Sequence, residues 1–179
     1  MINLRSKQRG AFSIEFALLG VVFSTMLIFT ADWVVKLSVQ GKMDRLSYSL
    51  VNIIKERTQL YGKDNYDIDQ AMVADIYSVG RSSLNRTLGG YDSANFGGEF
   101  ELLQFDFEGN ASVSTIEQGR GCQLEQTISQ MQDLSMVTSW GRRATLYRVT
   151  LCYETANWAG DLFDEDFTTI QSSSIMMGR

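Results

Sequence analysis

The sequence lacks proline and histidine altogether and has only two cysteines. Without proline, nothing breaks a long helix by the usual route, and rigid proline-rich linkers are excluded. Without histidine, the commonest general base and metal ligand is missing. The sequence also has no phosphate-binding glycine loop, no Ser–His pair and no cysteine set with metal-ligand spacing. We therefore expect no catalytic residues, no cofactor, no metal and no enzyme activity.

Basic residues are scarce beyond the first ten positions. The chain carries a formal charge of −5, and because Arg5, Lys7 and Arg9 give residues 1–10 a charge of +3, the remainder carries −8. An acidic remainder lacks the basic surface that neutralises phosphates, which argues against nucleic-acid binding. It argues equally against docking of the globular part on anionic lipid.

One group of acids is a weak candidate for a calcium site, because carboxylate oxygens are the ligands that calcium prefers. Its members are Asp161, Asp164, Glu165 and Asp166. The spacing and the glycine of an EF-hand are missing, so a solvated loop is the favoured interpretation.

A long apolar run follows the basic start of the chain. Residues 16–31 hold no charge, and the 21 residues from Ala11 to Ala31 hold only Glu15. As a helix, this run would extend about 31 Å, enough to cross a hydrocarbon core of about 30 Å. Since basic residues flank only its N-terminal side, we expect residues 1–10 in the cytoplasm and the C-terminal part outside. The length of 179 residues leaves room for one exported domain besides this anchor.

Glu15 helps to distinguish three interpretations of this apolar run: a secretory signal peptide, an ordinary signal anchor, and an anchor in which the acid is functional. A secretory signal peptide would have a shorter apolar region that ends in a small-x-small cleavage site. An ordinary signal anchor explains everything except an acid inside the span. Intramembrane acids are costly and often functional, although Glu15 lies near enough to the boundary to reach the headgroups.

The residues around Glu15 favour a functional role. The stretch Arg9-Gly-Ala-Phe-Ser-Ile-Glu15-Phe16 resembles the processing site of type IV prepilins, most closely that of Flp-type (tight-adherence) pilins. The resemblance implies that a membrane-embedded prepilin peptidase cuts between Gly10 and Ala11. It also implies that Glu15 and Phe16 serve assembly, with Glu15 setting the axial register against the new amine of a neighbouring subunit.

The helical pattern continues beyond the apolar run. Val39, Met43, Leu46, Leu50, Ile53 and Leu60 recur at helical spacing, and Gly62 is a plausible stop. We therefore predict one helix over 11–61. The stretch Gly41-Lys-Met-Asp-Arg-Leu-Ser-Tyr-Ser-Leu50 and the later Arg148-Val-Thr-Leu-Cys152-Tyr are similar to the TadF branch of the TadE/TadF pilin-like proteins. The chain lacks the proline that TadE-type spans often carry.

The exported part is expected to be small and mixed. Asp67 or Asp69 can cap a second helix that ends near Gly80 or Leu88. Strands are predicted over 99–108, 111–117, 143–155 and 167–177, with a hairpin at Gly109-Asn110. The predicted fold is α+β, an antiparallel sheet packed on the long helix. Outside the cytoplasm, Cys122 and Cys152 are expected to form a disulfide.

These expectations divide the chain into a basic leader (1–10), a transmembrane helix (11–35), its amphipathic continuation (36–61) and an exported domain (62–179). The function implied by the resemblance is that of a minor pilin-like subunit needed to assemble a tight-adherence (Flp) type IV pilus. It is expected either to stay in the inner membrane, with its C-terminal domain in the periplasm, or to enter the pilus. Its expected partners are prepilin peptidase, other pilin subunits, the inner-membrane assembly platform and membrane lipid, but no nucleic acid. The alternatives are a membrane-tethered periplasmic binding or sensor module, whose signal anchor stays uncut, and a type II secretion pseudopilin.

Overall fold

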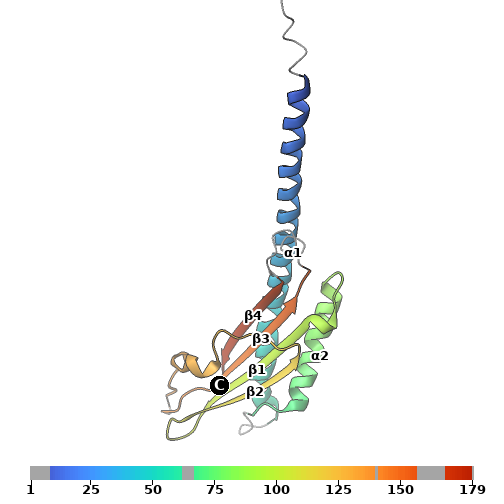
Figure 1. Ribbon diagram of the computed structural model, residues 1–179. Coiled ribbons are helices and arrows are strands. Elements are labelled where there is room, and N and C mark those ends of the chain that lie inside the picture. The colour runs from blue at the N-terminus through green and yellow to red at the C-terminus, as the bar shows by residue number, and fades with distance from the viewer. Residues whose placement is uncertain (1–8, 62–66, 140, 157–167, 179) are drawn as a thin grey trace, which may run out of the picture. The chain divides into compact units, whose positions relative to one another are not determined.

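The computed structural model describes residues 9–61, 67–139, 141–156 and 168–178 (Figure 1). The chain divides into two compact units. The first consists of residues 1–37 with 156–168, and the second of residues 38–155 with 169–179. The acidic group at 161–166 lies outside the described residues, so the structure does not test whether it binds calcium.

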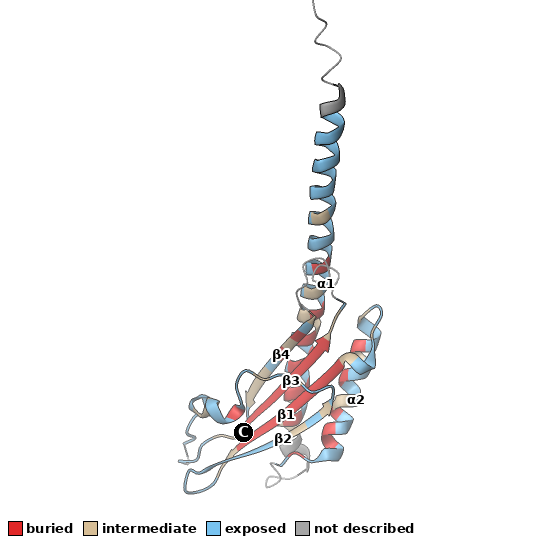
Figure 2. Ribbon diagram, in the orientation of Figure 1, coloured by how far each residue is buried: buried red, intermediate tan, exposed pale blue. Residues whose placement is uncertain are grey.

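The helix α1 extends from Arg9 to Tyr61, over 53 residues, which confirms the single helix predicted over 11–61 with a slightly earlier start. Within the first unit, nearly all of its side chains from Phe12 to Leu37 are exposed (Figure 2). Among the described residues, α1 is the one helix long and apolar enough to span a membrane. A helix that is apolar on all sides and exposed on all sides is suited to a lipid environment.

In the second unit, α1 buries one face. Val39, Met43, Leu46 and Leu50 are buried there, as the helical spacing predicted. The predicted stripe was wrong at Ile53, which is 49% exposed, while Val51 and Ile54 are buried. The reason is that a stripe at 3.6 residues per turn passes from Leu50 to Ile54.

The second helix, α2, extends from Gln70 to Thr87. The side chain of Asp69 accepts a hydrogen bond of 2.7 Å from the backbone N–H of Met72, so Asp69 is the N-cap and Asp67 is not. The helix passes through Gly80, whose missing side chain leaves room for Leu50 of α1.

Four strands form one antiparallel sheet in the order β2-β1-β3-β4. The strands are β1 (Phe96–Phe105), β2 (Ala111–Gly119), β3 (Leu146–Glu154) and β4 (Thr169–Met177). Two short 3₁₀ helices, η2 (Ser93–Asn95) and η3 (Ile128–Leu134), precede β1 and β3 respectively.

The β1 strand ends earlier than predicted, at Phe105, because Asp106 starts the turn. Its carboxylate accepts hydrogen bonds from the backbone N–H groups of Glu108 (2.9 Å) and Asn110 (2.8 Å). The pKa of Asp106 is lowered, chiefly by the hydrogen bond from the Asn110 side chain. Residues 106–108, which were predicted as the end of the strand, therefore belong to the turn, and the side chain of Phe107 is 86% exposed.

The core lies between the sheet and the two helices. Tyr147, Val149, Leu151 and Tyr153 of β3 belong to the large cluster that includes residues of α1 and α2. The alternate residues Leu146, Arg148, Thr150 and Cys152 lie on the opposite face, as the period of two predicted. The hydroxyl of Ser47 in α1 hydrogen-bonds to those of Ser172 (3.0 Å) and Ser174 (2.8 Å) in β4. The central strands β1 and β3 are the most buried (Figure 2).

Candidate functional site

The residues predicted for processing and assembly lie in the first two turns of α1. The helix begins at Arg9, so Gly10 and Ala11 occupy its first turn, where the backbone N–H groups have no partner four residues back. Glu15 and Phe16 follow in the next turn. The structure therefore places all four on one continuous helical segment.

Glu15 is exposed and makes no hydrogen bond or ion pair with any described residue. Phe16 is 69% exposed and stacks on Phe12, with the ring centroids 6.4 Å apart. A carboxylate beside exposed apolar rings is poorly matched to lipid, because the charge stays uncompensated there. The segment is thus suited to contact a group outside this chain.

The polar side chains farther along the apolar segment are satisfied within the helix. The hydroxyls of Ser24 and Thr25 each donate to the carbonyl of Val21 at 2.9 Å. The hydroxyl of Thr30 donates to the carbonyl of Leu27 at 3.0 Å. Such internal bonds let hydroxyl groups enter hydrocarbon without leaving a donor unpaired.

An ion pair lies at the C-terminal end of the apolar segment. The Nζ of Lys36 lies 2.6 Å from the carboxylate of Asp32, one helical turn away, and Asp32 is 4% exposed. Unlike Glu15, Asp32 therefore has its counter-charge within the same helix. Glu15 is thus the acid of this segment that has no ion-pair partner among the described residues.

In the second unit, Cys122 and Cys152 form the predicted disulfide. The bond ties the loop after β2 to β3, on the face of the sheet away from the helices. The loop crosses β1 closely, because a Cβ atom on Gly97 would lie only 1.7 Å from the carbonyl oxygen of Arg120. Only glycine fits this crossing.

The same face of the sheet carries a buried ion pair that the sequence analysis missed. Glu101 of β1 stands opposite Arg148 of β3, and their side chains form a salt bridge with both groups almost fully buried. Glu101 also accepts a hydrogen bond of 3.1 Å from the backbone N–H of Ile128, and Arg148 donates one of 2.8 Å to the carbonyl of Gln126. The pair therefore anchors the loop that precedes η3 as well as joining two strands.

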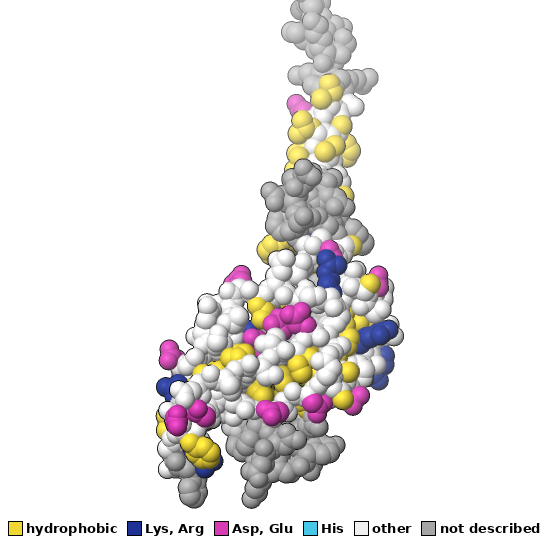
Figure 3. All heavy atoms as spheres, turned by 60° about the horizontal axis from the view of Figure 1, so that its bottom comes forward, with side chains coloured by type: hydrophobic (Ala, Val, Ile, Leu, Met, Phe, Trp, Pro, Cys, Tyr) yellow, Lys and Arg dark blue, Asp and Glu magenta, His cyan; other side chains and the backbone are white. Residues whose placement is uncertain are grey.

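A second glutamate lies beside this pair. Glu99 is 7% exposed, and burial raises its pKa to about 7, with the charges of Glu101 and Glu117 adding to the rise and Arg148 opposing it. Figure 3 shows acidic side chains at many points on the surface of the second unit, including a group near the middle of the face in view. Burial and the two neighbouring carboxylates thus bring the pKa of Glu99 close to neutrality.

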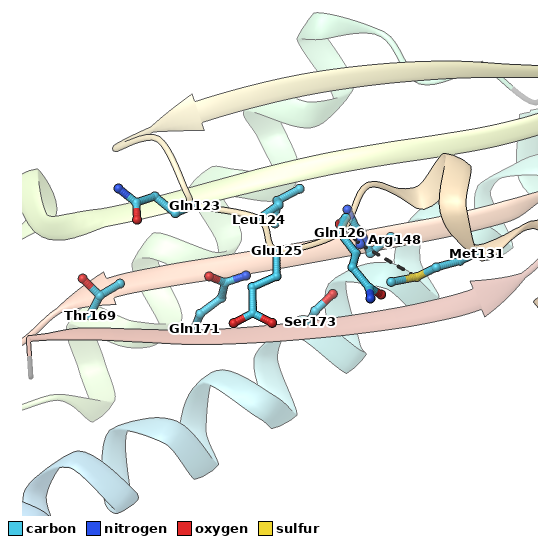
Figure 4. A pocket seen from close by; sticks show the side chains of 9 residues that line it. All are labelled: Gln123, Leu124, Glu125, Gln126, Met131, Arg148, Thr169, Gln171 and Ser173. Atoms are coloured by element: carbon cyan, nitrogen blue, oxygen red, sulfur yellow. Dashed lines mark hydrogen bonds between the residues drawn. The ribbon is translucent and has the colours of Figure 1, made fainter.

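A polar cavity of about 670 Å³ lies between the loop after the disulfide and strands β3 and β4 (Figure 4). Its lining residues are Gln123, Leu124, Glu125, Gln126, Met131, Arg148, Thr169, Gln171 and Ser173. Amide and hydroxyl side chains predominate, and the guanidinium of Arg148 is already engaged by Glu101. Among the described residues, no group of three or more acids or cysteines is placed to hold a metal ion.

The sequence contains one signal for the buried ion pair, which is the position of charged residues inside apolar strands. Glu99 and Glu101 alternate inside an apolar strand, which places both on one face, and Arg148 sits on the corresponding face of β3. What the sequence does not contain is the strand order that brings Glu101 and Arg148 opposite each other.

Comparison with known proteins places the chain in a family. The sequence model of TadF, described as tight adherence pilin protein F, matches residues 3–179. No curated protein and no solved structure matches the chain. The family match covers the apolar helix as well as the four-stranded domain, and such a helix fits a single-pass membrane anchor. The chain therefore belongs to the TadF family of tight-adherence pilins, whose role is that of a pilin-like protein interacting with other pilus subunits.

Proposed function

We propose that this chain is a minor pilin-like subunit needed to assemble a tight-adherence type IV pilus. In this proposal a prepilin peptidase cuts after Gly10, and the mature chain assembles through the exposed first part of α1. The observation that carries the proposal is Glu15, an exposed acid without a partner among the described residues, near the start of an apolar helix. The chain is the substrate of a peptidase and not itself an enzyme.

The chemistry of the cut explains the position of Glu15. Cleavage would create an α-amine on Ala11, with an ordinary pKa near 8 and hence mostly protonated at neutral pH. In a bundle of helices within the membrane, that amine needs a carboxylate, because the low dielectric strengthens the attraction between opposite charges. Glu15 of a neighbouring subunit can supply it, and the pairing sets the axial register between the two helices.

The cut leaves the helix largely intact. Removing residues up to Gly10 takes away only the first residues of α1, where few helical hydrogen bonds are formed. The helix from Ala11 onward keeps its apolar surface and its Asp32–Lys36 ion pair. Processing thus exposes a new charge and does not dismantle the segment that carries it.

The expected topology follows from charge and from the disulfide. The basic leader stays in the cytoplasm and the second unit lies in the periplasm, with the whole subunit anchored in the inner membrane. The Cys122–Cys152 bond supports an oxidising compartment for the second unit. The inner-membrane assembly platform and other pilin subunits are then the partners within reach.

The first test is the N-terminal residue of the full chain, extracted from membranes of cells with and without the cognate prepilin peptidase. We expect a start at Ala11 only where the peptidase is present, measured by intact mass and N-terminal sequencing. Gly10→Leu should keep the leader in both strains, while Gly20→Leu, a matched glycine inside the span, should still be cut. A chain that begins at Met1 in both strains would overturn processing and favour an uncut anchor.

A further inference from the structure

The two edges of the sheet differ in how they are protected. At β4, the side chain of Gln40 in α1 donates a hydrogen bond of 3.1 Å to the edge carbonyl of Gln171, and Ser47 hydrogen-bonds to Ser172 and Ser174. At β2, the outward backbone groups between Ala111 and Gly119 make no hydrogen bond to any described residue. The outward carbonyl of Gln171 in β4 is therefore bonded to α1, whereas the outward backbone groups of β2 bond to no described residue.

The open edge lacks the features that normally block pairing with another strand. Edge strands are protected by short length, proline, charged side chains (lysine above all) or a bulge, and β2 carries a single charge, on Glu117. The β2 strand has nine residues, contains neither proline nor lysine, and pairs with β1 without a break in register from Ala111 to Gly119. Seven of its nine residues are exposed. Such an edge is suited to accept a further strand.

The ladder shows which backbone groups are available. The backbone N–H of Arg120 donates to the carbonyl of Phe96, and that of Asp106 to the carbonyl of Asn110. Since bonded and non-bonded pairs alternate in an antiparallel ladder, the residues of β2 that bond to β1 are the even-numbered ones. The N–H and C=O groups of Val113, Thr115 and Glu117 therefore point outward, toward the free edge.

The charge on this edge indicates the chemistry of the incoming strand. Glu117 stands opposite Glu99 as a non-hydrogen-bonded pair, the arrangement in which facing side chains come closest. When Glu99 is ionised, the two like charges in this position are destabilising. Arg148 lies on the same face but is engaged by Glu101, and Arg120 is engaged by Glu154. A basic side chain beside Glu117 would supply the missing counter-charge.

We propose that the outer edge of β2 binds an extended peptide segment of a partner protein, antiparallel to β2, with a lysine or arginine beside Glu117. The outward N–H and C=O groups of Val113, Thr115 and Glu117 form the ladder, and Glu117 selects the basic residue. A second copy of β2 is a poorer occupant, because this strand has no basic residue to offer. The β2 strand belongs to the second unit and Gly10 to the first, so the proposal does not depend on processing at Gly10.

The test uses the full chain in detergent micelles, isotope-labelled for NMR, and a synthetic peptide as long as β2, Thr-Thr-Lys-Val-Thr-Ser-Val-Thr-Thr. In the antiparallel register its lysine falls opposite Glu117. We expect the outward amides of Val113, Thr115 and Glu117 to shift strongly and those of Ser114 and Ile116 much less. The same peptide with a central proline should not bind, because the ladder is interrupted.

Charge reversal tests the selectivity. Replacing the peptide lysine by glutamate should weaken binding roughly tenfold, since an attractive cross-strand pair becomes repulsive. In the Glu117→Lys protein the preference should reverse, while Glu108→Lys, at an exposed acid in the neighbouring turn, should leave it unchanged. Equal binding of both peptides, shifts that do not alternate along β2, or dimerisation through β2 without peptide would overturn the proposal.

Discussion

Glu99 and Glu117 stand directly opposite each other on β1 and β2, as the kind of antiparallel pair whose side chains approach most closely. One of the two is buried and the other exposed. The burial, rather than the neighbouring charge, is the larger reason why the pKa of Glu99 rises to about 7. The raised pKa of Glu99 makes the stability of the second unit depend on pH.

We predict that Glu99 makes the second unit less stable as the pH rises toward neutrality. Between its ordinary pKa of 4.5 and the raised value of about 7, the folded protein holds a proton that the unfolded chain has lost. Because the folded state binds more protons, the free energy of unfolding falls as pH rises through this window, by about 3 kcal/mol at most.

The measurement is urea unfolding of the full chain at a series of pH values, compared with Glu99→Gln. In the variant, the free energy of unfolding should no longer fall with pH through this window, and at pH 8 the variant should be more stable than the parent. Glu117→Gln should retain most of the slope, because burial contributes more than the charge of Glu117. An identical slope in the parent and in Glu99→Gln would show that Glu99 does not titrate in this range.

Breaking the Glu101–Arg148 pair should be costly. Arg148→Met leaves a buried carboxylate without its counter-charge, and we expect a loss of about 3 to 5 kcal/mol in the free energy of unfolding. The double variant Glu101→Leu with Arg148→Met should recover much of that loss, because an apolar pair leaves no buried charge. Chemical denaturation of the three proteins checks this, and a double variant as unstable as the single one would contradict it.

Removing the disulfide should destabilise the second unit without abolishing the fold. The bond joins residues 30 apart, and closing a loop of this size is worth about 3 to 4 kcal/mol on the chain-entropy account. The Cys122→Ser, Cys152→Ser double variant should therefore unfold at lower denaturant concentration. Reduction of the parent should give the same shift, and reduction of the variant should give none.

Glu15 is expected to act in assembly and not in membrane insertion. Glu15→Ala should insert normally, because removing a charge from an apolar segment favours insertion. Pilus assembly should fall sharply, since the new amine of the neighbouring subunit loses its partner. Surface pili are counted by electron microscopy, with Asp32→Asn as the matched acid in the same helix. Normal piliation in Glu15→Ala would refute the assigned role.

Much of the fold follows from local patterns in the sequence. A long charge-free run predicts the exposed part of α1, and spacing of three and four residues predicts its buried face up to Leu50. Alternation predicts which residues of β3 face the helices. These features depend on the intrinsic periodicities of helix and strand, so neighbouring residues suffice to reveal them.

Other features required the assembled sheet. The sequence placed Glu99, Glu101 and Glu117 in strands, but not next to one another or to Arg148. Only the order β2-β1-β3-β4 sets Glu101 against Arg148 and Glu99 against Glu117, and leaves the outward backbone groups of β2 without a bonded strand. Strand order depends on contacts between residues far apart in the chain, and no local pattern encodes it. The sequence by itself thus determined the anchor, the elements and the family, whereas tertiary pairing decided the charge environment of the sheet and its free edge.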